Sequence, residues 1–209
     1  MRCTALPPQC AESVNQSDSA GFAARGTMNW VRRIVIEKGL CPFAEPAVDS
    51  DRVRLVVSSA TCESTARDKF YTEVRLLMSA DPDEIVTTLI VMPDFATTDF
   101  LRFHEFASDI EDEISEDVNL VDAVLIAAFH PMHRYEGMGA DSALNFEKRA
   151  PYPTINILRT PLLDDYISQG RTMNIPHHNK QVLEKLGSDK LKLLYQLCVQ
   201  ENVHCHEEG

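Results

Sequence analysis

The sequence predicts an α/β fold, a small and mainly parallel sheet whose strands are joined by helical crossovers. Three strand-like segments alternate with two helix-like segments, a rhythm typical of parallel strands connected by helices. The third strand-like segment is apolar almost throughout, which indicates burial on both faces. A ferredoxin-like α+β arrangement uses the same elements with antiparallel neighbours, and it stays as the alternative.

The first predicted element is a helix over residues 28–40. It places Trp30 and Ile34 at helical spacing and ends at Gly39, a residue type typical of helix C-termini. After a proline-containing loop, the sequence alternates between two kinds of segment. Segments rich in β-branched residues predict strands, and segments with one apolar face predict helices. The predicted strands span residues 52–59, 84–93 and 120–129, and the predicted helices span residues 62–83 and 97–117.

The chain divides into three parts by composition. Residues 1–27 are small and polar with no apolar period, which predicts a disordered N-terminal extension. Residues 28–198 form a single predicted α/β domain, and residues 199–209 form a C-terminal tail. The 209-residue length and 44% hydrophobic content are sufficient for one well-packed core.

Charge and cysteine content restrict the partners and the compartment. A formal net charge of −12 argues against nucleic acid and acidic membrane surfaces, which attract basic proteins. No apolar run has the roughly 18 residues of a membrane span. Six cysteines without CxxC spacing or an export signal predict reduced thiols and a cytoplasmic protein. The alternative is an organelle, with residues 1–27 as a transit peptide.

Residues 127–160 are the best candidate for a functional segment. In a parallel sheet the carboxyl ends of the strands open onto the ligand-binding edge, and the third strand ends there at His130. Between Phe129 and Pro161 the chain has four Lys/Arg and three Asp/Glu, a local charge of +1 in an acidic protein. A relatively positive pocket of this kind suits a small anion. Long irregular segments in compact domains are usually functional or disordered.

Several side chains of this segment have suitable chemistry. His130 is a candidate acid or base near neutral pH. Arg149 and Arg159 offer planar forks for a carboxylate or phosphate. Asp141, Asn145 and Arg149 follow one another at spacings of four, so a helical turn would place them on one face. Hydrogen-bonded structure is the competing interpretation for each of these residues.

Cys41, outside this segment, is a candidate nucleophile if it pairs with His130. Its position after a helix C-terminus disfavours the thiolate, so plain packing is the competing interpretation. Tyr152, in a Pro-Tyr-Pro turn, completes the set of substrate-binding candidates. No metal site is predicted, because the chain lacks HExxH and EF-hand spacings, and no motif identifies a cofactor.

The motifs GLCPFAEP, FHP, NFEKRAPYP and ILR, in this order, resemble the family called domain of unknown function 1415. The resemblance extends from Trp30 to Leu186 and implies a shared fold and a shared site, but no reaction. It implies that Cys41, His130, Asp141, Asn145, Arg149 and Arg159 belong to the family pattern. The chain departs from the pattern at Asn156, where relatives carry histidine, and at Thr160, where they carry glutamate.

Two functional hypotheses follow. The first is an enzyme that acts on an anionic metabolite, bound by Arg149 and Arg159, with His130 as general acid or base. Asn145 would then stabilise developing charge, and Cys41 would be an optional nucleophile. The second is a non-catalytic ligand-binding or assembly protein whose polar side chains lock the long segment in place. The first hypothesis requires these groups to converge on an open pocket, whereas the second expects them to be buried and mutually satisfied.

Overall fold

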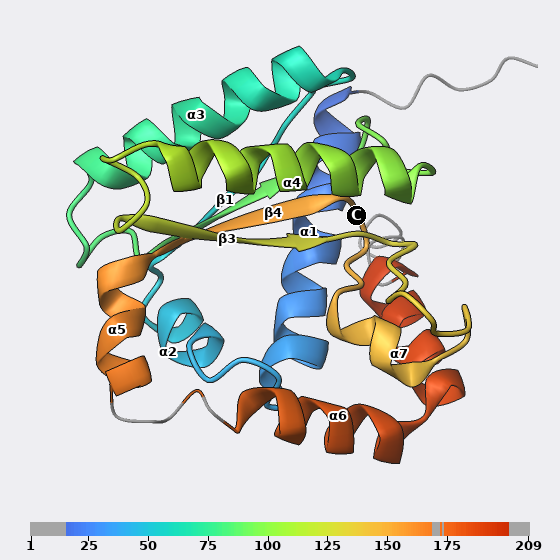
Figure 1. The fold of residues 1–209 in the computed structure, drawn as a ribbon. Helices are drawn as coiled ribbons and strands as arrows, with labels where there is room; N and C mark the ends of the chain where they lie inside the picture. Colours follow the sequence, from blue (N-terminus) through green and yellow to red (C-terminus); the bar gives the residue numbers. More distant parts are fainter. Residues whose placement is uncertain (1–15, 169–171, 173, 201–209) are drawn as a thin grey trace, which may run out of the picture.

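Four strands form one mixed sheet at the centre of the protein (Figure 1). The structure is a computed structural model and describes residues 16–168, 172 and 174–200. The strands are β1 (Val53–Val57), β2 (Thr87–Val91), β3 (Val124–Phe129) and β4 (Thr154–Arg159), in the order β1-β2-β4-β3. Strands β1 and β2 are parallel, and β4 pairs antiparallel with both β2 and β3. Three strands therefore run in one direction, and β4 lies between two of them in the opposite direction.

The α/β class predicted from the sequence is confirmed, and the insertion of β4 is the main addition to it. Residues 154–159, TINILR, belong to the segment that the sequence analysis left without a regular period. They alternate between the faces of the sheet, with Ile155 and Ile157 on one face and Asn156 and Leu158 on the other. The carboxyl ends of β1, β2 and β3 meet at one edge, as expected for parallel strands.

Two long helices cover one face of the sheet. They are α3 (Glu63–Ser79) and α4 (Phe100–Glu116), which connect β1 to β2 and β2 to β3. Figure 1 shows both helices lying along the same side of the strands. Their apolar stripes pack on the alternate sheet residues, and the largest fully buried side chains of this core are Phe70, Leu77, Phe103, Phe106, Ile110, Ile90, Met92, Ile155 and Ile157. We call this side the filled face.

Shorter helices from both ends of the chain cover the other face. They are α1 (Gln16–Trp30), the π-helix η1 (Val31–Ile36), α2 (Ala44–Asp49), α6 (Ile175–Leu186) and α7 (Ser188–Gln200). The core on this side includes Trp30, Ile34, Leu89, Phe146, Leu183 and Leu191. A 3-10 turn, η2 (Ala143–Glu147), packs against α6 and α7, and α5 (Thr160–Ser168) follows β4. We call this side the helical-layer face.

Both ends of the predicted domain differ from the sequence analysis. Helix α1 begins at Gln16, so the boundary predicted at residue 28 is wrong for residues 16–27. Ala23 and Thr27 are 1% and 0% exposed because this helix packs against α7 and the sheet. Helix α7 extends to Gln200, two residues into the predicted tail. The remainder of the predicted extension and tail, 1–15 and 201–209, lies outside the described residues.

Two further findings concern membranes and thiols. Among the helices that the structure describes, none has the length and apolarity needed to cross a bilayer. In the described ranges, Cys41 and Cys62 are free thiols, and the thiol of Cys198 donates to the carbonyl oxygen of Leu194.

Candidate functional site

His130 follows the last residue of β3 and is 1% exposed. Its Nδ1 accepts a hydrogen bond from the backbone N–H of Met132 at 3.0 Å, and its Nε2 lies 2.9 Å from the carbonyl oxygen of Ala96. Because Nδ1 accepts, the proton of the neutral ring is on Nε2, which donates to Ala96. Burial lowers the pKa of His130. The imidazole is therefore neutral, and its two nitrogens form hydrogen bonds with the backbone of two different loops.

Asn145 and Arg149 hold the segment after His130 together. Asn145 is fully buried, and its Nδ2 donates to the carbonyl oxygen of Gly139 at 2.9 Å. Arg149 donates from Nε to the carbonyl oxygen of His133 and from Nη2 to that of Ala140, at 3.0 and 2.9 Å. The two side chains replace the regular backbone hydrogen bonds that this irregular loop lacks.

Arg159 lies at the opposite edge of the sheet from His130. It pairs with Val124, the first residue of β3, whereas His130 follows the last residue of that strand. Its guanidinium donates to the backbone carbonyls of Leu77, Ala80 and Ile85. A strand's length, roughly 16 Å at 3.3 Å per residue, separates the two sites. The expectation that Arg149 and Arg159 form one clamp around His130 is therefore wrong.

The other two loop candidates lie apart from any enclosed space. Asp141 is exposed and forms an ion pair with Lys192, with 2.6 Å between Oδ1 and Nζ. The hydrogen bond and charge of Lys192 lower the pKa of Asp141. Tyr152 is partly buried, and burial raises its pKa. The predicted common face of Asp141, Asn145 and Arg149 does not form, because only Asn145 lies within a helical turn, η2.

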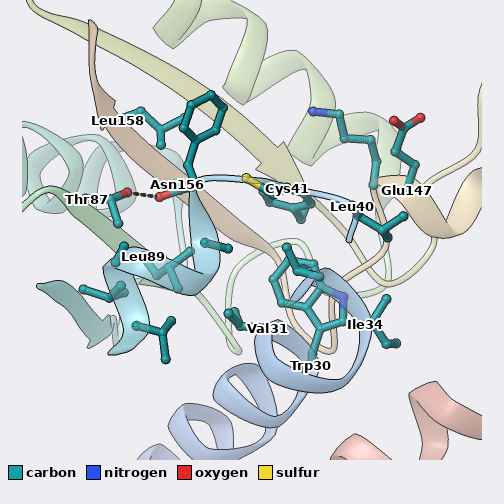
Figure 2. A pocket seen from close by; sticks show the side chains of 18 of the residues that line it. Trp30, Val31, Ile34, Leu40, Cys41, Thr87, Leu89, Glu147, Asn156 and Leu158 are labelled. Atoms are coloured by element: carbon teal, nitrogen blue, oxygen red, sulfur yellow. Dashed lines mark hydrogen bonds between the residues drawn. The ribbon is translucent and has the colours of Figure 1, made fainter. Parts of the chain in front are cut away.

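A partly open pocket lies between the sheet and the helical layer, and we call it the inner pocket. Its cavity measures about 270 Å³, just below the usual range of small-molecule sites. Figure 2 shows Trp30, Cys41 and Asn156, which come from three different elements, around one space. The wall is mostly apolar, with Trp30, Val31, Ile34, Leu40, Phe43, Ala47, Leu89, Phe129, Phe146 and Leu158 among its residues. Its polar members are Cys41, Thr87, Glu147, Lys148, Asn156 and Asn179.

The local structure of residues 31–40 opens this space. The π-helix η1 directly continues α1 and presents Val31 and Ile34 to the pocket. One extra residue per turn widens the helix, and π-helical segments frequently occur at functional sites. The segment ends at Gly39, which has φ +67°, a backbone conformation that favours glycine. The Nε2 of His178 lies 3.3 Å from where a Cβ would be at Gly39, so a side chain there would meet it.

Cys41 is the one predicted site residue that lines the inner pocket. Burial raises the pKa of its thiol, although the backbone N–H groups of Phe43 and Ala44 and the charge of Lys148 act in the opposite direction. The thiol is therefore protonated at neutral pH, and thiols are far weaker nucleophiles than thiolates. In this state the Cys41 side chain is suited to contact a ligand rather than to attack it.

Asn156 lies in the middle of the sheet and faces the inner pocket. Its Oδ1 is 2.6 Å from the hydroxyl oxygen of Thr87 (Figure 2), which is also 2.8 Å from the carbonyl oxygen of Ile157. Among the described residues no protein group bonds the amide nitrogen of Asn156. One of the two departures from the family pattern thus contributes a polar group to the pocket. The other, Thr160, begins α5 at the far edge of the sheet.

Two residues that line the pocket carry buried polar atoms with no hydrogen-bond partner among the described residues. They are Nε1 of Trp30, a donor, and Oδ1 of Asn179, an acceptor, on side chains that are 2% and 4% exposed. The Nδ2 of Asn179 donates to the carbonyl oxygen of Leu40 and to Glu147 at 3.1 and 2.9 Å. Each unpartnered atom has less than 1 Å² of accessible surface, so both lie behind the surface of the pocket and not on it.

Lys148 is the cation of the pocket. Its Nζ lies 5.1 Å from the centroid of the Phe129 ring, which also packs edge-on against Trp30 at 5.1 Å. Across the described ranges, no carboxylate forms an ion pair with Lys148. Glu147 is nearby in sequence, but its oxygens accept hydrogen bonds from Tyr135 and Asn179. The pocket thus combines an apolar body with one unpaired ammonium group.

No metal centre is apparent in the described residues, because they contain no group of three or more His, Cys, Asp or Glu side chains arranged to hold an ion. The residues that define the pocket were not recognised from the sequence, apart from Cys41. Trp30, Thr87, Asn156 and Asn179 are far apart in the chain, and only their positions on neighbouring elements bring them together. Asn156 is a polar residue between two isoleucines, and this local break in an apolar run is the feature of the sequence that distinguishes it.

Comparison with known families gives one match. The family described as "Protein of unknown function (DUF1415)" matches residues 23–193, well over half of the chain. The matched range begins at Ala23 in α1 and ends within the first half of α7, so it contains all four strands and the inner pocket. No curated protein and no solved structure matches the chain.

Proposed function

The chain belongs to the DUF1415 family, and we propose that it is a ligand-binding protein whose inner pocket holds a small amphipathic carboxylate. The apolar part of the ligand would lie against Trp30, Ile34 and Leu89, and its carboxylate would lie near Lys148. This proposal keeps the anionic ligand expected from the sequence and moves it from the loop to the pocket.

The observation that carries the proposal is an apolar pocket lined by a cation that no described carboxylate pairs. Lys148 lines the inner pocket and forms no ion pair with any described residue. An apolar chain that covers the rest of the wall would gain about 25 cal/mol for each Å² of apolar surface removed from water. A ligand with one apolar chain and one carboxylate would use both features of the pocket.

The charge of the ligand is inferred from Lys148. An ammonium group beside apolar walls is poorly solvated, and a carboxylate is its natural partner. Asn156, with an amide nitrogen that no described residue engages, offers a second donor on the sheet side. A carboxylic acid with a short apolar chain fits the 270 Å³ cavity better than a bulky polyanion does.

Binding is favoured over catalysis by the state of the candidate groups. His130 uses both ring nitrogens within the protein, and the thiol of Cys41 has a raised pKa. General acid–base catalysis needs a group that can reach the substrate proton at the working pH. Neither residue meets that requirement, which supports the hypothesis of a ligand-binding protein over that of a metabolite enzyme.

The test uses Trp30, the one tryptophan of the chain, as a built-in reporter. We expect carboxylates from butyrate to decanoate to change the Trp30 fluorescence saturably and to raise the melting temperature, because a ligand that binds only the folded state stabilises it. The primary alcohols of the same lengths should bind at least about tenfold more weakly, a difference of about 1.4 kcal/mol for the lost charge pair.

Two pocket variants and two controls make the test specific. Lys148→Met should remove the preference for carboxylates over alcohols, and Asn156→Leu should weaken the binding of carboxylates. Lys185→Met, which removes an exposed charge on α6, and Cys62→Ser, outside the pocket, should leave both responses unchanged. If no chain length gives a saturable signal below about 1 mM, which corresponds to only about −4 kcal/mol, the proposal is wrong.

A further inference from the structure

A second hollow lies along the free edge of β3, on the other side of Phe129 from the inner pocket. Strand β3 pairs with β4 on one side only, and the hollow lies between this edge, α4 and the loop after His130. We call it the edge cleft and define it by Phe100, His104, His133, Tyr135, Lys148 and Arg149. Its inner part measures about 170 Å³ and continues into a wider hollow of about 1120 Å³.

The edge cleft contains two partly buried cations, and the carboxylate whose charge acts on Arg149 is that of Asp141, which itself forms an ion pair with Lys192. In the part of the chain that the structure describes, neither Lys148 nor Arg149 forms an ion pair. Arg149 uses Nε and Nη2 to bond backbone carbonyls, which leaves the hydrogens of its Nη1 available. In a protein with a net charge of −12, two adjacent unpaired cations are an unusual concentration of positive charge.

The pKa of His133 indicates the sign of the electrostatic potential in the cleft. His133 packs edge-on against Tyr135 and Phe100, and its Nε2 is buried without a partner. Its pKa is lowered to about 4, mainly by burial and to a smaller extent by the charges of Lys148, Arg149, His104 and His130. No carboxylate contributes to this shift.

The acidic residues that line the cleft do not cancel this charge. Asp99 accepts a hydrogen bond from the backbone N–H of Arg102 at the start of α4. Glu111 and Glu136 lie at the rims of the inner and outer parts, and both are exposed. Glu147, beside Lys148, is bonded by Tyr135 and Asn179. The centre of the cleft is therefore positive, and its rim has mixed charge, because the exposed Arg134 also lines the outer part.

We propose that the edge cleft is a second binding site, for a small oxyanion of the phosphate type, held by Lys148 and Arg149 and lying beside His133. Fork-shaped guanidinium groups and ammonium groups are the usual protein partners of phosphate oxygens. The net charge of −12 disfavours an extended polyanion such as nucleic acid, whereas a small anion would contact only the positive centre of the cleft. His133 lies where the anion would stabilise its protonated form.

This site is independent of the inner pocket, although Lys148 lines both. Arg149 and His133 contact only the edge cleft, whereas Asn156 and Cys41 contact only the inner pocket. Variants of each pair therefore separate the two proposals. In the wild type, a failure to bind phosphate while carboxylates bind would contradict only the edge cleft, and a failure to bind carboxylates while phosphate binds would contradict only the inner pocket.

The experiment follows the C2 proton of each histidine ring by NMR in the full chain, with inorganic sulfate as the probe. Sulfate keeps its charge over the whole range from pH 4 to pH 8, so only the protein titrates. We expect sulfate to raise the pKa of His133 by about one unit or more, because an anion beside an imidazole favours the imidazolium. His177, on the exposed surface of α6, serves as the internal reference and should not shift.

Inorganic phosphate and phenyl phosphate are then titrated at pH 7 to identify the source of the oxyanion. Equal affinity indicates a free anion, and tighter binding of phenyl phosphate indicates a phosphate monoester whose organic part lies against Phe100. Lys148→Met and Arg149→Met should each weaken both probes at least about tenfold. Lys185→Met and Arg75→Met, which remove exposed cations elsewhere, should not.

The proposal is overturned if sulfate leaves the His133 titration unchanged, or if the control variants lose as much affinity as the cleft variants. Arg149→Met also removes two hydrogen bonds of the loop. If Arg149→Met does not fold, two measurements still test the proposal. The first is phosphate binding by Lys148→Met, because the side chain of Lys148 forms no hydrogen bond of this kind. The second is the titration of His133 in the wild type.

Discussion

The two faces of the sheet are built from alternate residues of the same strands, yet they are packed differently. On the filled face, Ile155 and Ile157 of β4 are 0% exposed and pack under two regular helices. On the helical-layer face, Asn156 and Leu158 line a pocket beside a π-helix. The period of two along a strand thus separates a close-packed core from a face with open space.

Polar groups are buried on both faces. On the filled face, the buried Glu73 is engaged by Arg54 and Lys69 at 2.7 and 2.8 Å. Burial alone would raise the pKa of Glu73, but the hydrogen bonds and charges of these two cations outweigh it and lower the pKa. Among the described residues, Thr88 Oγ1 on the filled face and Trp30 Nε1 on the helical-layer face both lack a hydrogen-bond partner. The two faces therefore differ in how completely they are packed and not in how well their polar atoms are satisfied.

The largest expected effect compares neighbours on β4. Ile157→Ala, on the filled face, should lower the free energy of unfolding by about 2 to 5 kcal/mol, because it creates a cavity in a close-packed core. Leu158→Ala should cost only roughly 1 to 2 kcal/mol, since Leu158 is partly exposed and already borders empty space. Urea unfolding of both variants measures the difference. Equal losses would mean that the two faces are packed alike.

The second prediction adds volume instead of removing it. Ala66→Leu, at a 0% exposed position of α3, should destabilise the protein by about 1 to 3 kcal/mol through overpacking. Ala47→Leu, in the wall of the inner pocket, should leave the stability unchanged or raise it by up to about 1 kcal/mol. Ala47→Leu should also abolish the fluorescence response of Trp30 to carboxylates. A destabilised Ala47→Leu variant would mean that the cavity closes in solution.

The contrast between the faces also explains what the sequence predicts well. The helices and strands of the filled face have strong apolar periods, so α3, α4 and the first three strands are recognised from local patterns. Strand β4 was missed because the polar Asn156 breaks its apolar run and because its partners, β2 and β3, are distant in sequence. Antiparallel insertion between parallel strands has no local signal.

The site was predicted less well than the fold. Residues such as His130, Asn145 and Arg159 were recognised as important polar positions, but the structure engages them in hydrogen bonds with the backbone. The sequence cannot distinguish a polar residue that fixes a loop from one that binds a ligand, because both need the same side chains. Cys41 and Asn156 reach the inner pocket through tertiary packing, which local spacing does not encode.

The third prediction concerns the edge between the two faces. The unfolded pKa of histidine is about 6.5, and the folded pKa of His133 is about 4. Between these values the unfolded chain binds a proton that the folded protein does not. Stability should therefore fall as the pH drops from about 6.5 to about 4, by up to about 1.4 kcal/mol per pH unit for this one group.

Replacing His133 with phenylalanine keeps an aromatic ring against Tyr135 and Phe100 and removes the titration. The melting temperature of His133→Phe should consequently depend less on pH across this window than that of the wild type. His177→Phe, at an exposed position, is the matched control and should keep the wild-type dependence. Identical profiles for His133→Phe and the wild type would place the acid sensitivity elsewhere, for example in His130, whose pKa burial also lowers.

The smallest expected effect is on rates of thiol labelling and compares one cysteine on each side of the molecule. Cys62, before α3 on the filled face, has a thiol pKa lowered to about 7 by hydrogen bonds from Ser64 and Thr65. Burial in the inner pocket raises the pKa of Cys41. Because the thiolate is the reactive species, Cys62 should react with a disulfide reagent faster than Cys41 at pH 7.

Mass spectrometry of labelled peptides assigns the two rates, and Cys62→Ser and Cys41→Ser confirm the assignment. A carboxylate bound in the inner pocket should slow the labelling of Cys41 and leave Cys62 unaffected, since only Cys41 lines that pocket. The labelling rate of Cys41 would then report whether a ligand is bound in the inner pocket. Equal protection of both thiols would instead indicate a general stabilisation of the fold. That result would contradict the proposal that the carboxylate binds in the inner pocket.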